Sequence, residues 1–384
     1  MNIDLFDLPG NVKIELRGDF RKKIFRFAQD KSKTLLNLSK ILNIDYYTLL
    51  NFKHGRNFLP LEFLKGFAEY LEIDIDLFRK NYIAIHTKRG GKIKLNFPIT
   101  IDKDFCWIIG FIIADGHISK SLSGLIISNN DETLIKLSED IIRNTFMDCK
   151  RFMKVSRNKI RPKNILLEIN SMILATIFSL FIKNGQKFDV AEAPKFIFNS
   201  DKEMICYFLR GIFDGDGYVK FNRKKYSRCI GIRVSSHKLI DDITKLLNIL
   251  NIKSLKYDIK DRHEFCLQIS DYQNIKKFYE LVNFNQKNRR KLLNDVLLSY
   301  KQIQKPDGMS EKIALEIVKN IEPCTALEFI NEYKCSRIRG QIILQKLYKN
   351  KLISRERIGR RTYLYRYLNN PPIPPRPSNF SPLI

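Results

Sequence analysis

The sequence is poor in acidic residues. Only 41 of its 384 residues are Asp or Glu, against 68 Lys and Arg, which leaves a formal net charge of +27. The excess is spread along the chain, because residues 1–90, 91–300 and 301–384 carry net charges of +5, +13 and +9. Such a distribution argues against a single basic tail. It indicates contact with an extended polyanion, most commonly nucleic acid, with a merely solvated basic surface as the alternative.

The sequence also lacks paired cysteine motifs and long apolar runs. Its seven cysteines include no Cys-x-x-Cys spacing, which argues against a zinc knuckle or a disulfide framework and predicts reduced thiols. No apolar signal segment opens the chain, and WIIGFIIA at 107–114 and ILATIFSLFI at 173–182 are too short to cross a bilayer. We therefore expect a cytoplasmic, nucleoid-associated protein without a membrane partner.

The middle of the chain contains one pattern twice, about a hundred residues apart. IIGFIIADG at 108–116 and LRGIFDGDG at 209–217 both end in Asp-Gly. After each phrase the apolar periodicity predicts two strands, a helix, two strands and a helix, and each copy closes in a Gln-Lys pair. The predicted fold class is α+β. It consists of a pseudo-twofold pair of αββαββα units, two four-stranded sheets with helices on one face, within a monomer.

Each phrase is expected to form a helix with one close-packing face. Gly110 and Ala114 lie four residues apart, as do Gly211 and Gly215, so each pair shares one side of its helix. Small residues on one face let two helix backbones approach closely. The two helices are therefore predicted to pack against each other at the pseudo-twofold axis.

Asp115 and Asp216 fall at the ends of these helices, 101 residues apart. A carboxylate there opposes the helix macrodipole by about 0.3–1 kcal/mol, and the glycine after each acid is expected to be a left-handed cap. Either acid alone is explained by a solvent-facing helix end, but the matched pair favours a shared Mg²⁺ (or Mn²⁺) in a phosphodiester hydrolase. Asp214 is unmatched, since Ile113 takes its place in the first copy, and we interpret it as a local polar contact.

The paired phrases resemble the signature of the LAGLIDADG homing endonucleases in their single-chain, two-motif form, over about residues 100–300. The segment EAPKFIFNSDKEMICYFLRGIFDGDG is also similar to the lead-in of the second motif in intein-type members. The resemblance implies metal-dependent double-strand cleavage of a long asymmetric DNA site. By position it implies that Asp115 and Asp216 bind the metal, and that Lys187 and Lys287 tune the attacking water or the phosphate charge.

Two other functions remain open at this stage. One is a non-catalytic transcriptional regulator on the same fold, although loss of catalysis usually appears as missing acids, and both acids are present here. The other is a maturase that binds intron RNA. The chain lacks the first-residue nucleophile and the final His-Asn of a self-splicing intein, so we expect a free-standing enzyme.

Basic residues follow the strands that would form a DNA-binding saddle. A β-ribbon fits the major groove, where Arg and Lys read guanine edges or hold phosphates. A solvated surface charge is the alternative for each of them. The candidates on exposed strand faces are Arg157, Lys159, Arg161 and Lys163 in the first copy and Lys220, Arg223, Lys224, Lys225, Arg228 and Arg233 in the second.

The N-terminal segment resembles a phage-repressor type of helix-turn-helix. Apolar periodicity in KTLLNLSKILNIDYYTLLNFKHG at 33–55 predicts two short helices joined by a turn, within an all-α domain. A helical bundle for protein contact is the alternative. Tyr46, Tyr47 and Asn51 would lie on the recognition helix, with Lys53 and Arg56 near phosphates.

The C-terminal segment resembles a winged helix, with three predicted helices and a basic hairpin. Its DNA-binding candidates are Arg337, Arg339, Arg360 and Arg361, and protein contact is again the alternative. A Pro-rich tail, expected to be extended and disordered, follows. The predicted domains are residues 1–90, 91–305 (with repeats at about 100–200 and 201–300), 306–370 and the tail 371–384.

Overall fold

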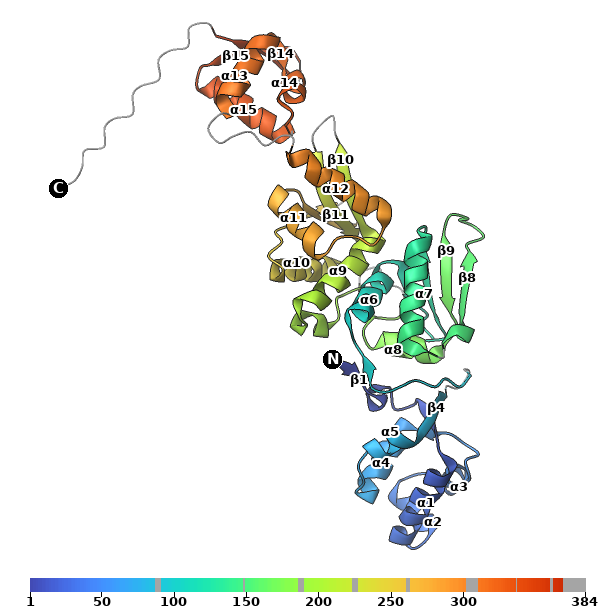
Figure 1. Cartoon of the computed structure of the whole chain (residues 1–384). Coiled ribbons are helices and arrows are strands. Elements are labelled where there is room, and N and C mark those ends of the chain that lie inside the picture. The colour runs from blue at the N-terminus through green and yellow to red at the C-terminus, as the bar shows by residue number, and fades with distance from the viewer. Residues whose placement is uncertain are drawn as a thin grey trace, which may run out of the picture. The chain divides into compact units, whose positions relative to one another are not determined.

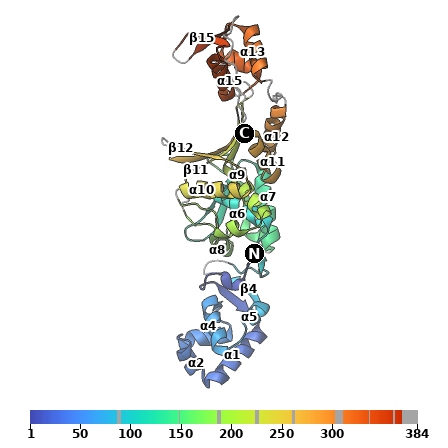
Figure 2. The same ribbon diagram turned by 90° about the vertical axis from the view of Figure 1, so that its left-hand side faces the viewer.

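The computed structural model of the chain is α+β, as the sequence predicts (Figures 1 and 2). It divides into two compact units, one of residues 1–217, 232–267 and 280–287 and the other of residues 218–231, 268–279 and 288–384. The residues that the structure describes are 1–86, 91–147, 149–185, 190–222, 227–259, 263–301, 310–335, 337–359 and 362–368.

The first repeat has the predicted αββαββα order. Its sheet is antiparallel with strand order β6-β7-β9-β8, and α6, α7 and α8 all contact it (Figure 1). Alternate strand residues such as Ile127 and Leu167 are fully buried, and each such side chain contributes about 1.5–3 kcal/mol relative to an exposed one. The elements are α6 (Lys103–Asp115), β6 (Gly116–Ile118), β7 (Leu125–Asn129), α7 (Glu132–Phe146), η2 (Lys150–Phe152), β8 (Met153–Arg157), β9 (Ile165–Ile169) and α8 (Met172–Ser179).

The second repeat follows the same plan. Its sheet has the corresponding order β10-β11-β13-β12, and Figure 2 shows α10 running along it. Asp102 and Asp201 cap the first helix of each repeat by accepting a backbone N–H at 2.8 Å. The elements are η3 (Lys195–Asn199), α9 (Lys202–Asp216), β10 (Gly217–Asn222), β11 (Ser227–Val234), α10 (His237–Ile249), β12 (Leu255–Ile259), β13 (Glu264–Ile269), α11 (Tyr272–Leu281) and α12 (Lys287–Lys301).

The N-terminal part contains the expected helices but is not all-α. A three-stranded sheet of order β3-β2-β4 accompanies them, and β1 pairs with β5. Strand β2 pairs with β4 about seventy residues later, so local periodicity could not reveal the sheet. The elements are β1 (Asn2–Ile3), η1 (Leu5–Asp7), β2 (Lys13–Leu16), α1 (Gly18–Ser32), α2 (Leu35–Ile41), α3 (Tyr46–His54), β3 (Leu59–Pro60), α4 (Leu61–Leu71), α5 (Asp76–Asn81), β4 (Tyr82–His86) and β5 (Ile99–Thr100).

The C-terminal part contains the three predicted helices and the hairpin. A buried core that includes Val318, Phe329 and Leu344 joins them, and the strand order is β14-β16-β15. The predicted tail at 371–384 lies outside the described residues. The elements are α13 (Ser310–Ile321), β14 (Cys324–Thr325), α14 (Ala326–Tyr333), α15 (Arg337–Lys349), β15 (Ile353–Arg357) and β16 (Tyr363–Tyr367).

All seven cysteines are buried thiols outside any disulfide, and all of them are described. Burial raises the pKa of Cys106 to about 12 and the pKa values of Cys206 and Cys324 to about 11. Across the described part of the chain, no helix combines the length and the apolar character needed to cross a membrane.

Candidate active site

Helices α6 and α9 cross with their backbones in direct contact. A Cβ atom placed on Gly110 would fall on the carbonyl oxygen of Phe208, and one on Gly211 would fall on the carbonyl oxygen of Trp107. Ideal Cβ positions at the two glycines also lie 3.1 Å from the Ile212 nitrogen and 2.8 Å from the Phe111 nitrogen respectively. No side chain fits in either place, so glycine is required on both helices.

These contacts obey a local twofold relation. A shift of 101 residues takes Trp107 to Phe208 and Gly110 to Gly211. The contact of Gly110 with Phe208 and the contact of Gly211 with Trp107 are therefore the same contact made once from each repeat. The internal repeat that the sequence predicts is thus also present in the packing of α6 against α9.

The same crossing brings the C-terminal ends of both helices together. A Cβ on Gly215 would collide with the Cβ of Ala114 and lie 3.0 Å from Oδ2 of Asp115. Asp216 is the next residue of α9 and its last one. Asp115 is half-buried and Asp216 is exposed. The structure therefore places the two acids at adjoining helix ends.

The glycines that follow the acids do not adopt the expected left-handed conformation. Gly116 has φ −101° and ψ 167°, and Gly217 has φ −75° and ψ 158°, because each passes directly from its helix into a strand. A Cβ on Gly116 would lie 2.8 Å from the carbonyl oxygen of Ile112, and one on Gly217 would lie 2.5 Å from that of Phe213. Glycine thus provides clearance at the helix ends.

Asn129 is a site residue that the sequence analysis missed. Its Nδ2 donates a hydrogen bond of 2.6 Å to Oδ2 of Asp115 from the end of β7. The corresponding residue at the end of β11 is Val234, which has no polar side chain. A single polar residue at a strand end carries no periodic signal. Only its position two residues before a helix cap could have drawn attention to it.

Asp214 is fully buried, and both of its carboxylate oxygens accept hydrogen bonds. Its Oδ2 accepts from Nε1 of Trp107 at 2.9 Å, and its Oδ1 accepts from the backbone N–H groups of Asn285 and Gln286 at 2.8 and 3.3 Å. Burial of a carboxylate is costly unless donors surround it. Asp214 therefore ties α6 and α9 to the segment that leads to Lys287.

The two candidate lysines differ in what the structure describes. Lys287 is exposed and is the first residue of α12, whereas Lys187 lies outside the described residues. Groups of three or more His, Cys, Asp or Glu side chains that could hold a metal are absent from the described ranges. The two carboxylates at the helix ends are the metal donors that the sequence predicts, and they do not form such a group within the described ranges.

Most of the described basic candidates of the two repeats are exposed. Lys159, Arg161 and Lys163 lie in the turn between β8 and β9, and Lys220 and Arg233 lie on β10 and β11. The predicted candidates Arg223, Lys224 and Lys225 lie outside the described residues.

Arg157 is exposed, but it does not lie on the open face of the sheet, where it was expected. It pairs with buried Ile165, so it lies at the end of the helix-covered side of the sheet. The open side instead carries Lys154, which pairs with Glu168 and which the sequence analysis did not select.

Arg228 corrects the expectation of an exposed strand residue. It is only 8% exposed, and its guanidinium carbon lies 4.4 Å from the centroid of the Tyr300 ring. Its Nε donates to Oγ of Ser299 at 2.7 Å. β11 is buried on both faces over residues 228–232, so the sequence lacks the alternation that would have shown which side Arg228 takes.

The N-terminal candidates lie on or just after α3. Tyr47 is 71% exposed, Tyr46 is 36% exposed and Asn51 is half-buried. Arg56 is exposed, whereas Nζ of Lys53 donates to Oε1 of Gln29 at 2.8 Å and is held against α1.

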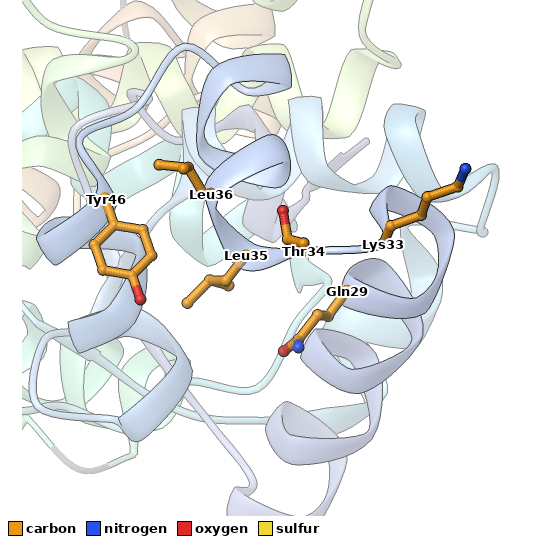
Figure 3. A pocket seen from close by; sticks show the side chains of 6 residues that line it. All are labelled: Gln29, Lys33, Thr34, Leu35, Leu36 and Tyr46. Atoms are coloured by element: carbon orange, nitrogen blue, oxygen red, sulfur yellow. The ribbon is translucent and has the colours of Figure 1, made fainter.

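A pocket of about 470 Å³ lies beside α3 at the junction of α1 and α2, remote in sequence from both acids (Figure 3). The residues that line it are Gln29, Lys33, Thr34, Leu35, Leu36 and Tyr46.

The C-terminal candidates are only partly described. Arg337 and Arg339 are exposed on the first turn of α15, and this helix contains no acidic residue. Arg360 and Arg361 lie outside the described residues.

Comparison with curated proteins gives relatives that are much longer than this chain. The chain is 30% identical over 58% of its length to the DNA-directed RNA polymerase subunit Rpo1C of Methanocaldococcus jannaschii, covering 25% of that protein. It is 24% identical over 90% of its length to the glutamine–fructose-6-phosphate aminotransferase of the same organism, covering 31% of that protein. The chain thus spans about a quarter to a third of these relatives.

Comparison with solved structures gives the homing endonuclease I-DmoI in complex with DNA and Ca. The TM-score is 0.37 and the identity 14%, and the match covers 50% of this chain and 97% of that one. Full-length DUF199/WhiA from Thermatoga maritima also matches, with a TM-score of 0.37 and 13% identity, over 66% of this chain and 93% of that one.

Among protein families, residues 203–283 match the one described as LAGLIDADG-like domain. This match begins in α9 and extends into the end of the second repeat, and therefore includes Asp216. Residues 203–283 of the second repeat are therefore similar to a LAGLIDADG-like domain.

Proposed function

We propose that the chain is a site-specific endonuclease that hydrolyses both strands of a long asymmetric DNA site with the help of Mg²⁺ or Mn²⁺. The observation that carries this proposal is the reciprocal crossing of α6 and α9, which places Asp115 and Asp216 at adjoining helix ends. Two carboxylates at such ends oppose both helix dipoles and repel each other. That arrangement is favourable when a cation is bound between or beside them.

The residues present suit a divalent cation. Asp115 and Asp216 offer the hard oxygen ligands that Mg²⁺ accepts, and these two side chains would hold it. When bound, the cation supplies charge neutralisation at the scissile phosphate and activation of water. Asn129 orients the Asp115 carboxylate through its 2.6 Å hydrogen bond, and the exposed Lys287 ammonium would balance charge at the phosphate.

The named activities of the relatives do not transfer to this chain. An RNA polymerase subunit, an aminotransferase, a replication factor subunit and a ribonucleotide reductase subunit share a segment with it, although their activities differ. One shared segment cannot account for four unrelated activities. A segment that recurs within unrelated proteins is what a mobile insertion with its own nuclease would leave, and this supports the proposal.

The flanking parts would extend the DNA contact. The N-terminal helices α2 and α3 and the C-terminal helix α15 with its hairpin would act as a helix-turn-helix and a winged helix. Exposed Tyr47 and Arg56 on the first module and Arg337 and Arg339 on the second support this assignment. The net charge of +27 would draw the whole chain to DNA.

The experiment is cleavage of a randomised or host-genomic DNA library with Mg²⁺ by wild type, Asp115→Asn and Asp216→Asn. Asparagine keeps the size of the side chain and removes its charge, so folding and DNA affinity should persist. We expect discrete double-strand cuts by the wild type and none by either variant. Tight, salt-sensitive binding without cutting by any form would instead identify a non-catalytic DNA-binding regulator.

A further inference from the structure

One face of helix α9 holds the turn that follows α11, residues 281–286, through Arg210, Phe213 and Asp214. We call this set of contacts the grip. Arg210 donates to the carbonyl oxygens of Val282 and Leu281. One helical turn later, the Phe213 ring packs edge-on against Phe284, with centroids 6.4 Å apart. The two side chains stand three residues apart on the helix and therefore share a face. This face is distinct from the glycine face that packs on α6.

Asp214 completes this grip on the same face. Its Oδ1 accepts the consecutive N–H groups of Asn285 and Gln286, and its Oδ2 accepts the Trp107 indole N–H. Hydrogen bonds to a charged acceptor are about twice as strong as neutral ones, and this carboxylate is fully buried. Gln286 immediately precedes Lys287, so the turn is fixed up to the residue before the lysine.

The first repeat cannot make the same grip from α6. The 101-residue shift places Ile109, Ile112 and Ile113 where α9 has Arg210, Phe213 and Asp214. Isoleucine side chains neither donate nor accept hydrogen bonds. The two halves therefore share the glycine crossing and the terminal acid but differ in how α6 and α9 can hold a following segment.

We propose that Asp214, assisted by Arg210, is a positioning residue for Lys287. The same helix ends in Asp216, so the grip sets the place of the lysine backbone relative to that acid. Loss of the grip would free the segment before Lys287 and so disturb the second half most, while in the first half it would release the Trp107 indole N–H. This inference rests on the proposed endonuclease function, because it assigns Lys287 to cleavage of one of the two DNA strands.

The test is strand-resolved cleavage of the DNA site, with the two strands carrying different dyes. Asp214→Asn removes the charge and turns an amide NH2 group either toward the Trp107 indole N–H or toward the Asn285 and Gln286 N–H groups, which weakens the grip. Misplacement of a catalytic group by about 1 Å can cost roughly 100-fold, so we expect a roughly 10- to 100-fold loss on one strand. Lys287→Met should slow the same strand, and the double variant should be no slower than Lys287→Met alone.

A matched control separates positioning from general destabilisation. Asp242, in the same repeat as Asp214, is also buried, at 1% exposure, and accepts from the Ala193 N–H and from Lys238. Asp242→Asn should leave the ratio of the two strand rates unchanged. If Asp214→Asn fails to fold, Arg210→Met tests the same grip, because it releases the Val282 and Leu281 carbonyl groups. It also removes the guanidinium from the Tyr207 ring, whose centroid lies 4.4 Å away.

Two results would overturn the inference. One is an equal loss on both strands for Asp214→Asn, or for Arg210→Met where Asp214→Asn does not fold. The other is a double variant whose loss on the strand is the product of the two single losses. A folded wild-type chain that cuts neither strand of any DNA would contradict the endonuclease itself, which is a distinct outcome.

Discussion

At the scale of single residues, the crossing of α6 and α9 depends on the absence of two side chains. Gly211→Ala would place a methyl group on the Trp107 carbonyl oxygen, where backbone cannot yield without separating the helices. Overpacking of this kind typically costs about 1–3 kcal/mol. We expect a lower thermal midpoint and loss of cleavage, measured by calorimetry and by the DNA assay.

Gly66→Ala is the control for this change. Gly66 lies inside α4, and a Cβ there meets no atom within 4 Å. Alanine is favoured over glycine in a helix interior by about 0.5–1 kcal/mol, so stability should hold or rise. A Gly211→Ala protein as stable and active as the Gly66→Ala protein would contradict the close crossing.

Two basic residues of the second repeat should respond differently to neutralisation. Arg228 stacks on Tyr300 and bonds Ser299, so Arg228→Gln should reduce stability and leave the salt dependence of DNA binding unchanged. Lys220 is exposed, so Lys220→Gln should leave stability unchanged and reduce the salt slope by about one. Thermal melts and binding isotherms at several salt concentrations measure both. A reduced salt slope with unchanged stability for Arg228→Gln would instead indicate that Arg228 contacts DNA.

At the scale of elements, α14 begins with a reciprocal cap that is sensitive to pH. Glu328 accepts the Thr325 N–H at 2.7 Å, and this backbone hydrogen bond, with a second bond from the Thr325 hydroxyl, lowers the pKa of the carboxyl below 4.5. Because the folded pKa is lowered, the stabilisation is present above the unfolded pKa of 4.5 and is lost as pH falls through the folded value.

The measurement for this cap is amide hydrogen exchange of α14 in full-length protein. Glu328→Ala should weaken protection at pH 7, by a few tenths to about 1 kcal/mol since the group is exposed, and the difference from wild type should shrink near pH 3. Glu332→Ala, also exposed on α14, is the control and should show no such pH dependence. A Glu328→Ala difference that stays constant over this range would contradict the cap.

The elements also show what sequence can and cannot predict. The order of both repeats was predictable, because amphipathic periodicity and the two small-residue phrases are local patterns. The sheet of β2 and β4 was not, since its pairing joins residues about seventy positions apart. The side taken by Arg228 was hidden because β11 is buried on both faces.

The candidate site likewise contains residues that the sequence could identify and contacts that it could not. Asp115 and Asp216 could be selected from their matched phrases, but their placement at adjoining ends depends on a helix crossing that only coordinates show. Asp214 was recognisable as an unmatched polar residue, but the local contact expected for it is wrong, because its partner Trp107 lies 107 residues away. Its partners Asn285 and Gln286 were not recognisable, because they lie 71 and 72 residues further along the chain.

At the scale of the whole molecule, charge should govern DNA affinity. Each phosphate contact contributes about −0.9 to the slope of log K against log salt, and six to ten contacts lose about 10³–10⁵ in affinity between 50 and 200 mM salt. We expect a steep slope for full-length protein, which Arg337→Gln and Arg339→Gln each reduce by about one. Lys346→Gln is the control, since Lys346 already pairs with Glu311. A slope unchanged by both arginine variants would place α15 away from DNA.

The burial of every cysteine makes the chain suitable for site-selective labelling. A thiol reacts as its thiolate, and Cys106, with a pKa of about 12, is almost wholly protonated near neutral pH. A cysteine introduced at Ile160, which is 90% exposed in the turn between β8 and β9, would face little competition for a maleimide dye. One fluorophore could then report the arrival of this turn at a nucleic acid while all seven native thiols stay in place.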